Sequence, residues 1–472
     1  MKLRRRAKLA LLCLAVVLVS GLGYAGYLIA QMAPIGTAYA AKTLCSWVFV
    51  SSRPAGDVIR DDIVVDVHPL LRLVRMSVDT SRRIATATFL SFARRDAEYR
   101  PGLGCTLALG TPGPAMALTL ADGAGASTAP TASSADISTG PPGPGIDAVK
   151  LQAAVDWAFA EPDAARLRRT RALLVLHDAR IVAERYAPGF SAKTPMPGWS
   201  MAKTATAVLI GALVKGGKLS VEQNALLPEW RAAGDPRAEI TLDQLLRMTS
   251  GLHFTERYND PGSDVALMLF ARADGAGYAI DKPLDAAPGT RWQYSSGTSN
   301  VLSRVIRVAL GGSEQDYLAF PRRVLFNPLG MHSAIIEPDA SGTYVTSSYM
   351  YATARDWARL GELLRQDGVW GGHRILPQGW VRYMATPTPQ SQRKDFGAHL
   401  WVKVTPPFNS MFVPAPALPP DAFHAIGYEG QFVSVIPSRR LVVVRLGLSR
   451  GDHVWDHEAF LAQLLEAFPR TP

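Results

Sequence analysis

The longest apolar run of the chain lies near its N-terminus, where no charged residue occurs from Leu9 to Ala30. At a rise of about 1.5 Å per residue, a helix of this length just crosses a hydrocarbon core about 30 Å thick. Five basic residues precede the run: Lys2, Arg4, Arg5, Arg6 and Lys8. Because cationic flanks stay in the cytoplasm, we expect everything after Gln31 to be exported.

A cleaved signal peptide is the alternative interpretation of this segment. Ala38-Tyr39-Ala40 has the small-x-small pattern of a cleavage site, but it lies beyond Pro34 and Gly36, at a distance from the apolar run. Signal peptides are usually cleaved close to that run. We therefore predict that residues 1–40 are a cytoplasmic tail and a single-pass anchor in the cell membrane, with the catalytic domain on the periplasmic side.

Residues 41–110 are expected to form a small β-rich segment. Short apolar runs at Trp47–Ser51, Ile63–Val67 and Ile84–Phe89 resemble strands, and Thr80–Arg83 resembles a turn. Residues 111–145 are rich in Gly, Pro, Ala, Ser and Thr with almost no charge. This composition cannot nucleate a core and predicts a linker.

The cysteines bear on the compartment. Cys13 lies inside the apolar run, which leaves Cys45 and Cys105 in one exported segment. Two thiols in an oxidising compartment favour one disulfide, and two unpaired thiols are the alternative.

From residue 146 to 472 the pattern predicts one larger domain. It begins with a helix from Asp147 to Trp157, followed by a hairpin of strands at 172–176 and 181–186. A Pro-rich stretch then leads to Ser200, and the almost wholly apolar segment Thr204–Val214 predicts a buried helix.

Ser200 and Lys203 are three residues apart where this helix begins, so they share one face. A serine hydroxyl becomes a strong nucleophile when a neighbour removes its proton, and a desolvated lysine has a pKa low enough for that task. Ser391-Gln392-Arg393-Lys394 has the same spacing but lies in a polar stretch that opens no apolar helix. The context therefore singles out the first pair.

Two further segments accompany this pair. Residues 240–252 predict a capped helix that Gly251 ends. Tyr294 and Ser296 lie in a small-residue loop ahead of a helix at 300–308, and a tyrosine phenol can exchange a proton with a lysine base and a leaving group.

Together these motifs resemble the serine β-lactamase and penicillin-binding superfamily, in particular class C-related esterases and 6-aminohexanoate-dimer hydrolases. Ser200-Met201-Ala202-Lys203 is similar to the first box and Tyr294-Ser295-Ser296 to the Tyr-x-Asn box. Leu245 to Leu252 resembles the L-L-x-H-T-S-G-L signature, and Ala425 to Phe432 stands where the superfamily has K-T-G. The resemblance implies an α/β (α+β) fold, an antiparallel sheet flanked by helices beside a helical lobe.

The resemblance also implies residue roles. Ser200 would be the acylated nucleophile, Lys203 its base and Tyr294 the proton relay, with the backbone N–H groups of Ser200 and Tyr428 as the oxyanion hole. Candidate substrate contacts are Ser296, Tyr258, Gly427 and His424.

The chain departs from the family pattern at two positions. Ser296 replaces the Asn of the second box, and Ala425 replaces the Lys of the third, which weakens any inference about β-lactams. His424 and Ala425 are neighbours on a strand and cannot both face the cleft.

Composition excludes other classes. The net charge is +10, from 50 Lys+Arg and 40 Asp+Glu. Five of these positive charges precede residue 9, and no other basic block resembles a nucleic-acid footprint. The histidines form no HExxH or HxH cluster, so we expect neither a metal nor another cofactor.

We therefore predict a membrane-anchored serine hydrolase of small-molecule esters or linear amides. The alternatives are a non-catalytic cell-wall or peptide-binding protein on the same scaffold, a true β-lactamase or D-Ala-D-Ala carboxypeptidase, and an α/β-hydrolase, which would need a parallel sheet.

Overall fold

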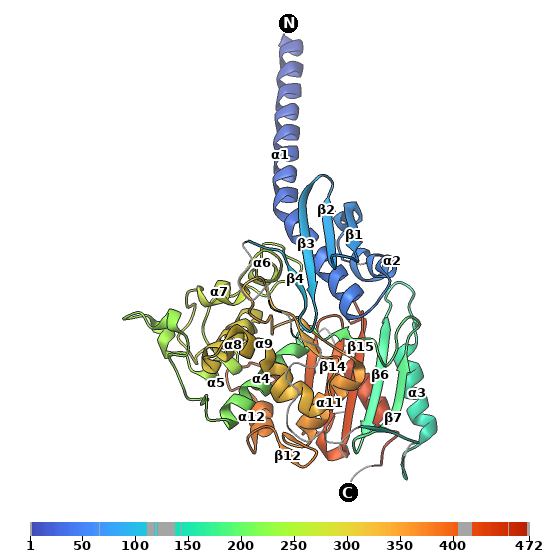
Figure 1. Ribbon diagram of the computed structural model, residues 1–472. Coiled ribbons are helices and arrows are strands. Elements are labelled where there is room, and N and C mark those ends of the chain that lie inside the picture. Colours follow the sequence, from blue (N-terminus) through green and yellow to red (C-terminus); the bar gives the residue numbers. More distant parts are fainter. Residues whose placement is uncertain are drawn as a thin grey trace.

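A computed structural model describes residues 2–65, 67–110, 118, 120, 137–141, 143–404, 418–451 and 453–469. Its centre is a six-stranded sheet in the order β13-β14-β15-β6-β7-β5 (Figure 1). The strands are β13 (Phe423–Gly427), β14 (Gln431–Ile436), β15 (Leu441–Gly447), β6 (Thr170–His177), β7 (Arg180–Tyr186) and β5 (Ser138–Thr139). Neighbouring strands are antiparallel except the edge pair β5 and β7.

Helices cover both faces of this sheet. Strands β14 and β15 are buried along their whole length, as expected for apolar strands between two helical layers. One face packs against α11 (Ala354–Arg365) and α4 (Met201–Lys215), and the other against α3 (Ala148–Phe159) and α13 (His457–Leu465). The antiparallel sheet confirms the expected architecture and excludes the α/β-hydrolase alternative.

A helical lobe lies beside the sheet (Figure 1). Its helices are α5 (Leu242–Leu246), α6 (Asp264–Phe270), α7 (Gly275–Ile280), α8 (Ser296–Leu310), α9 (Glu314–Pro321), α10 (Asn327–Leu329) and α12 (Trp380–Ala385). Helix α5 has the expected capping box of Thr241 and Gln244, but it is shorter than predicted. Met248 has a φ of 60°, and a left-handed residue cannot continue a right-handed helix.

Short strands complete the domain: β8 (Met196–Pro197), β9 (Ile335–Ile336) and β10 (Met350–Ala352) form one small sheet, and β11 (Val369–Trp370) pairs with β12 (His373–Arg374). Strand β5 lies within the predicted linker. Most of that linker lies outside the described residues.

The N-terminal part consists of α1 (Lys2–Cys45) packed on an antiparallel sheet of β1 (Val74–Asp79), β2 (Ile84–Phe89), β3 (Phe92–Arg100) and β4 (Gly104–Leu107). The strand at 84–89 and the turn at 80–83 are confirmed. The prediction of strands at 47–51 and 63–67 is wrong. Ser46–Val50 and Ile59–Val64 form π-helical turns, with the short α2 (Ala55–Val58) between them. A short apolar run does not distinguish a strand from a buried helical segment.

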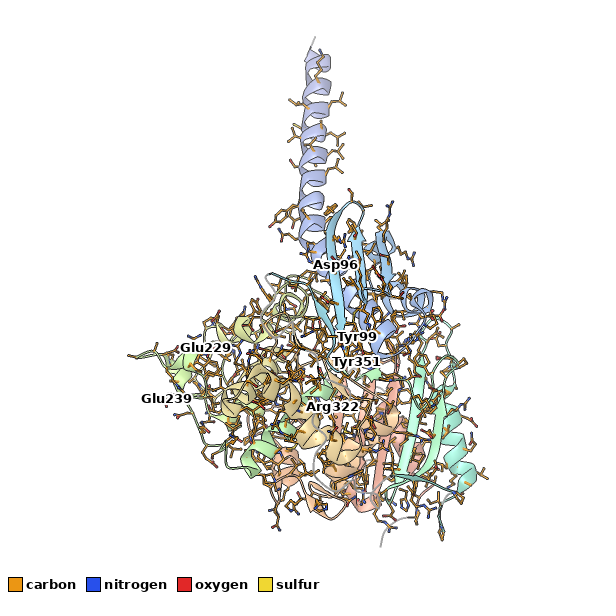
Figure 2. The ribbon with its side chains drawn as sticks, viewed as in Figure 1. Asp96, Tyr99, Glu229, Glu239, Arg322 and Tyr351 are labelled. Carbon is orange, nitrogen blue, oxygen red and sulfur yellow. A yellow bond between two sulfur atoms is a disulfide. The ribbon has the colours of Figure 1, made fainter. Side chains whose placement is uncertain are left out.

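Buried charges join this N-terminal part to the larger domain that follows residue 146. Lys42 forms an ion pair with Glu337, whose carboxylate also accepts hydrogen bonds from Ser46 (2.9 Å) and the Cys105 amide (2.6 Å). Tyr351, whose position Figure 2 shows, packs edge-on against Trp47. A disulfide links Cys45 to Cys105, whose Cα atoms lie 6.0 Å apart.

The N-terminal half of α1 projects away from the body (Figure 2), and its large apolar side chains from Leu11 to Leu22 are exposed. It is one helix that is long and apolar enough to cross a membrane, judged by length and composition. A signal sequence passes the same test.

Candidate active site

Ser200 lies at the N-terminus of α4, in a loop pressed against the end of β13. A Cβ on Gly427 would come within 2.1 Å of the Gly198 carbonyl oxygen, and a Cβ on Gly198 within 2.3 Å of the Trp357 ring. Trp199, which lies between Gly198 and Ser200 in the sequence, has a left-handed φ of 47°. Such strained residues cluster at functional sites, where the surrounding packing holds them. The two glycines therefore fix Ser200 close to the turn after β13.

The ammonium group of Lys203 is buried beside Ser200. Its side-chain nitrogen Nζ lies 3.0 Å from Ser200 Oγ, 3.0 Å from Ser296 Oγ and 2.9 Å from the Ser347 carbonyl oxygen. Burial lowers the pKa of Lys203 to about 8, although the charge of Glu256 acts in the opposite direction. A substantial fraction of this lysine is therefore neutral near pH 8.

Tyr294 completes the group around the serine. The Ser200 hydroxyl lies close enough to the phenol to influence its pKa, and the ring centroid of Tyr294 lies 5.0 Å from Lys203 Nζ. Trp401 stacks on the ring and Phe396 meets it edge-on, with centroids 5.6 and 6.0 Å away. Burial raises the pKa of Tyr294, so the phenol carries its proton at neutral pH. The structure thus brings together the three residues predicted to be catalytic.

Glu256 is a site residue that the sequence reasoning missed. Its carboxylate accepts hydrogen bonds from the Ser296 amide (2.8 Å), the Ser296 hydroxyl (2.5 Å) and the Tyr258 hydroxyl (2.6 Å). In the sequence, only its position two residues before the candidate substrate contact Tyr258 indicates that Glu256 could belong to the site. Ser296, predicted to contact substrate, is fully buried between Lys203 and Glu256, which corrects that prediction.

Aromatic side chains surround the entrance. Tyr258 and Tyr428 are both about half exposed, and their rings stack with centroids 5.4 Å apart. Trp199 meets Tyr428 edge-on at 5.9 Å. These rings form one wall next to Ser200.

The structure does not place His424 at this site. Its ring is buried, and Nδ1 lies 2.8 Å from Ser434 Oγ, which in turn contacts His457 of α13. Strand alternation turns His424 toward α13, whereas Ala425 faces the core layer that contains α4. The prediction of a substrate contact is therefore wrong for His424.

The second Ser-x-x-Lys copy makes no such cluster. Ser391 donates to Asp395 at 2.6 Å, and Lys394 donates to the Pro389 carbonyl. Among the described residues, no group of three or more His, Cys, Asp or Glu could hold a metal ion.

Comparison with known proteins places this fold in one class. Residues 155–465 match the Beta-lactamase family. The 6-aminohexanoate-dimer hydrolase of Paenarthrobacter ureafaciens is 29% identical over 224 residues, which cover 45% of this chain and 56% of that protein. The match thus spans only about half of the relative.

Solved structures give the same fold. A family VIII carboxylesterase superposes with a TM-score of 0.50 at 17% identity, covering 70% of this chain and 98% of that one. A penicillin-binding protein homologue from Caulobacter crescentus has a TM-score of 0.50 at 16% identity, covering 67% and 95%. This chain belongs to the beta-lactamase family.

Proposed function

We propose that this protein is a serine hydrolase that cleaves neutral esters or linear amides through an acyl-enzyme on Ser200. The observation that carries the proposal is the hydrogen-bond arrangement around Lys203. Ser296 gives its own proton to Glu256, so its oxygen accepts from Lys203, and the Ser347 carbonyl can only accept. The neutral amine of Lys203 has two N–H groups, and these two acceptors engage both of them. Its lone pair is therefore left for the Ser200 hydroxyl, 3.0 Å away.

Acylation follows from this geometry. Ser200 Oγ attacks the substrate carbonyl carbon while its proton passes to Lys203 Nζ, and the carbonyl oxygen becomes an oxyanion. The amides of Ser200 and Tyr428 are the proposed oxyanion hole. Within the described ranges neither amide donates to a protein acceptor, so both remain available. The close approach of Gly427 to Gly198 supports their convergence.

Collapse of the tetrahedral species requires a proton for the leaving group. Tyr294 is protonated and adjoins Ser200, so it is suited to deliver its proton to the departing oxygen or nitrogen and to recover one from Lys203. Water then attacks the acyl-enzyme with the same groups in reverse, which releases the acid and restores the Ser200 hydroxyl.

The proposed substrate class follows from Ala425, which stands where the superfamily has the Lys of its K-T-G segment. Ala425 is buried and apolar where lactamases place a cation, so it offers no ionic contact to a substrate carboxylate. Neutral short esters and amides need no such contact. The names of the 6-aminohexanoate-dimer hydrolase and of the carboxylesterase support a linear amide or an ester as the bond that is cleaved.

We also propose that α1 stays attached and anchors the domain in the membrane. Cleavage after Ala40 would remove Thr37, Ala38 and Ala40, which are fully buried. It would also remove Tyr39, which packs against Phe270 at 5.7 Å. The positive flank of α1 supports a catalytic domain on the exported side.

The test is steady-state hydrolysis of a short p-nitrophenyl ester and of a linear amide by wild-type protein. Ser200→Ala and Lys203→Ala are compared with Ser391→Ala and Lys394→Ala, the matched pair from the second motif. We expect kcat to fall by at least ~100-fold in the first pair only. Equal effects in both pairs would refute the mechanism.

A further inference from the structure

A cavity of about 270 Å³ lies between α1, the N-terminal sheet and the catalytic domain. Its wall is mainly aliphatic and aromatic and combines distant parts of the chain: Met32, Leu71, Phe89, Ala266, Leu269 and Phe270. Protein pockets of similar or larger volume hold small organic ligands. The volume of the cavity suits a small organic ligand, and its lining indicates that this ligand is apolar.

One end of the cavity reaches the candidate active site. Trp199, Tyr258 and Tyr428 all line it, and Trp199 directly precedes Ser200. Tyr428 is also the residue whose amide we assign to the oxyanion hole. A ligand in the cavity therefore contacts the residue before the proposed nucleophile and a residue of the proposed oxyanion hole.

The charged groups in the wall are already neutralised. Glu429 and Arg450 are both buried and form an ion pair at 2.7 Å. Glu429 also accepts from the Trp199 indole at 3.1 Å, and Arg450 donates to the Asp62 carbonyl oxygen at 2.6 Å. Because these charges have partners, the cavity does not select a charged ligand.

The other end of the cavity lies where the apolar helix enters the body. Leu28 is still exposed, and the cavity wall begins one turn later at Met32. The apolar surface of α1 therefore continues into the cavity. An aliphatic chain can lie along this path, with its polar end next to Ser200.

The position of Tyr294 decides which part of the substrate enters. Tyr294 does not line this cavity and instead lines a separate pocket with Arg291 and Arg393. The leaving group must lie next to the phenol that protonates it. The cavity is therefore on the acyl side of the scissile bond.

We propose that this cavity binds the hydrocarbon chain of a long-chain acyl ester or acyl amide. The inference rests on the proposed function, because it requires acylation of Ser200. The N-terminal part then contributes directly to substrate selection, since its residues, among them Met32, Leu71 and Phe89, line the acyl site.

The experiment uses the full chain in detergent and p-nitrophenyl esters with acyl chains from C2 to C10, kept below their micellar concentrations. Each buried methylene is worth up to about a 4-fold gain in kcat/KM. We expect kcat/KM to rise 2- to 4-fold per methylene over several carbons. Acetate esters of alcohols from C2 to C10 should show no such series.

Two variants locate the effect. Ala266→Phe fills the cavity and should lower the C10 to C2 ratio of kcat/KM at least tenfold, whereas Leu269→Ala enlarges it and should move the optimum to longer chains. Ala385→Phe, in a pocket that shares no residue with the cavity, should keep the wild-type ratio.

The outcomes separate the two proposals. A C2 ester that is not turned over in a Ser200-dependent manner defeats the proposed function itself. If the C2 ester is turned over in a Ser200-dependent manner, three results would overturn the acyl site alone. These are a kcat/KM that does not change with acyl length, an equal rise with the length of the alcohol, and a wild-type C10 to C2 ratio of kcat/KM in Ala266→Phe.

Discussion

The protonation of Lys203 sets the pH dependence of the reaction. Burial lowers its pKa to about 8, and only the neutral amine can accept the Ser200 proton. We therefore expect kcat/KM for a neutral ester to rise with pH and to level off above about pH 8. The measurement is a pH–rate profile between pH 5.5 and 10. A plateau that already begins below pH 6 would contradict Lys203 as the base.

Glu256 influences the pKa of this lysine through its negative charge. Its negative charge raises the pKa of Lys203, so Glu256→Gln should lower that pKa and shift the rising limb of the profile to lower pH. The variant should also lose activity on the plateau, because the amide no longer accepts both Ser296 contacts as a carboxylate does. A reduced plateau with an unmoved limb would indicate that Glu256 acts on structure alone.

Tyr294 supplies the proton to the leaving group in this account. Tyr294→Phe keeps the packing against Trp401 and Phe396 and removes only the hydroxyl. Loss of a positioned general acid costs about 10²- to 10⁴-fold. The loss should be smaller for p-nitrophenyl esters than for alkyl amides, since p-nitrophenolate leaves without a proton. Equal losses on both substrates would contradict the assignment.

At the scale of elements, much of this site was predictable from local patterns. The apolar run after Lys203 predicted α4, which begins immediately after Ser200, and the capping motif predicted the start of α5. Alternation along β13 correctly indicated that His424 and Ala425 face opposite ways. Period and caps are local properties, so a single sequence reveals them.

Other features depend on long-range contacts and escaped prediction. Glu256 reaches Ser296 across 40 positions of sequence, and nothing in its spacing marks that contact. The apolar runs at Trp47 and Ile63 predict strands, whereas both segments form helical turns with buried side chains. Local patterns do not reveal the cavity for the same reason, because its walls come from segments far apart in the sequence.

Gly427 gives a test at the scale of elements. A methyl group there would come within 2.1 Å of the Gly198 oxygen, so Gly427→Ala must push β13 away from the loop that carries Ser200. We expect kcat to fall at least tenfold while cooperative thermal unfolding persists. Ala425→Gly, two residues earlier on the same strand, serves as the control for a general change in β13. Wild-type kcat in Gly427→Ala would show that this close approach does not position the nucleophile.

At the scale of the whole molecule, the disulfide ties the end of α1 to β4. It closes a loop of 60 residues, and chain entropy alone assigns about 4 kcal/mol to a loop of that length. The double variant Cys45→Ser/Cys105→Ser should lower the free energy of unfolding by about 2–5 kcal/mol, measured by urea denaturation against the disulfide-bonded wild type. An unchanged midpoint would contradict a stabilising role.

Substrate preference also belongs to the whole molecule, since several segments shape the cleft. Without a cation at Ala425, benzylpenicillin lacks an ionic contact worth about 1.5–3 kcal/mol, a 10- to 150-fold handicap in kcat/KM against a short ester. Arg393 lines the pocket beside Tyr294, so Arg393→Ala is measured in parallel. Faster turnover of penicillin than of the ester, lost in Arg393→Ala, would show that an arginine replaces the missing lysine.

The central claim is that Ser200 becomes acylated with the help of Lys203. The most direct measurement treats wild-type protein, Ser200→Ala and Lys203→Ala with a fluorophosphonate ester probe at pH 8 and maps the modified peptide by mass spectrometry. The account predicts one adduct on Ser200 in the wild type, none in Ser200→Ala, and labelling at least ~100-fold slower in Lys203→Ala. An adduct on another serine, or undiminished labelling of Ser200→Ala, would contradict it.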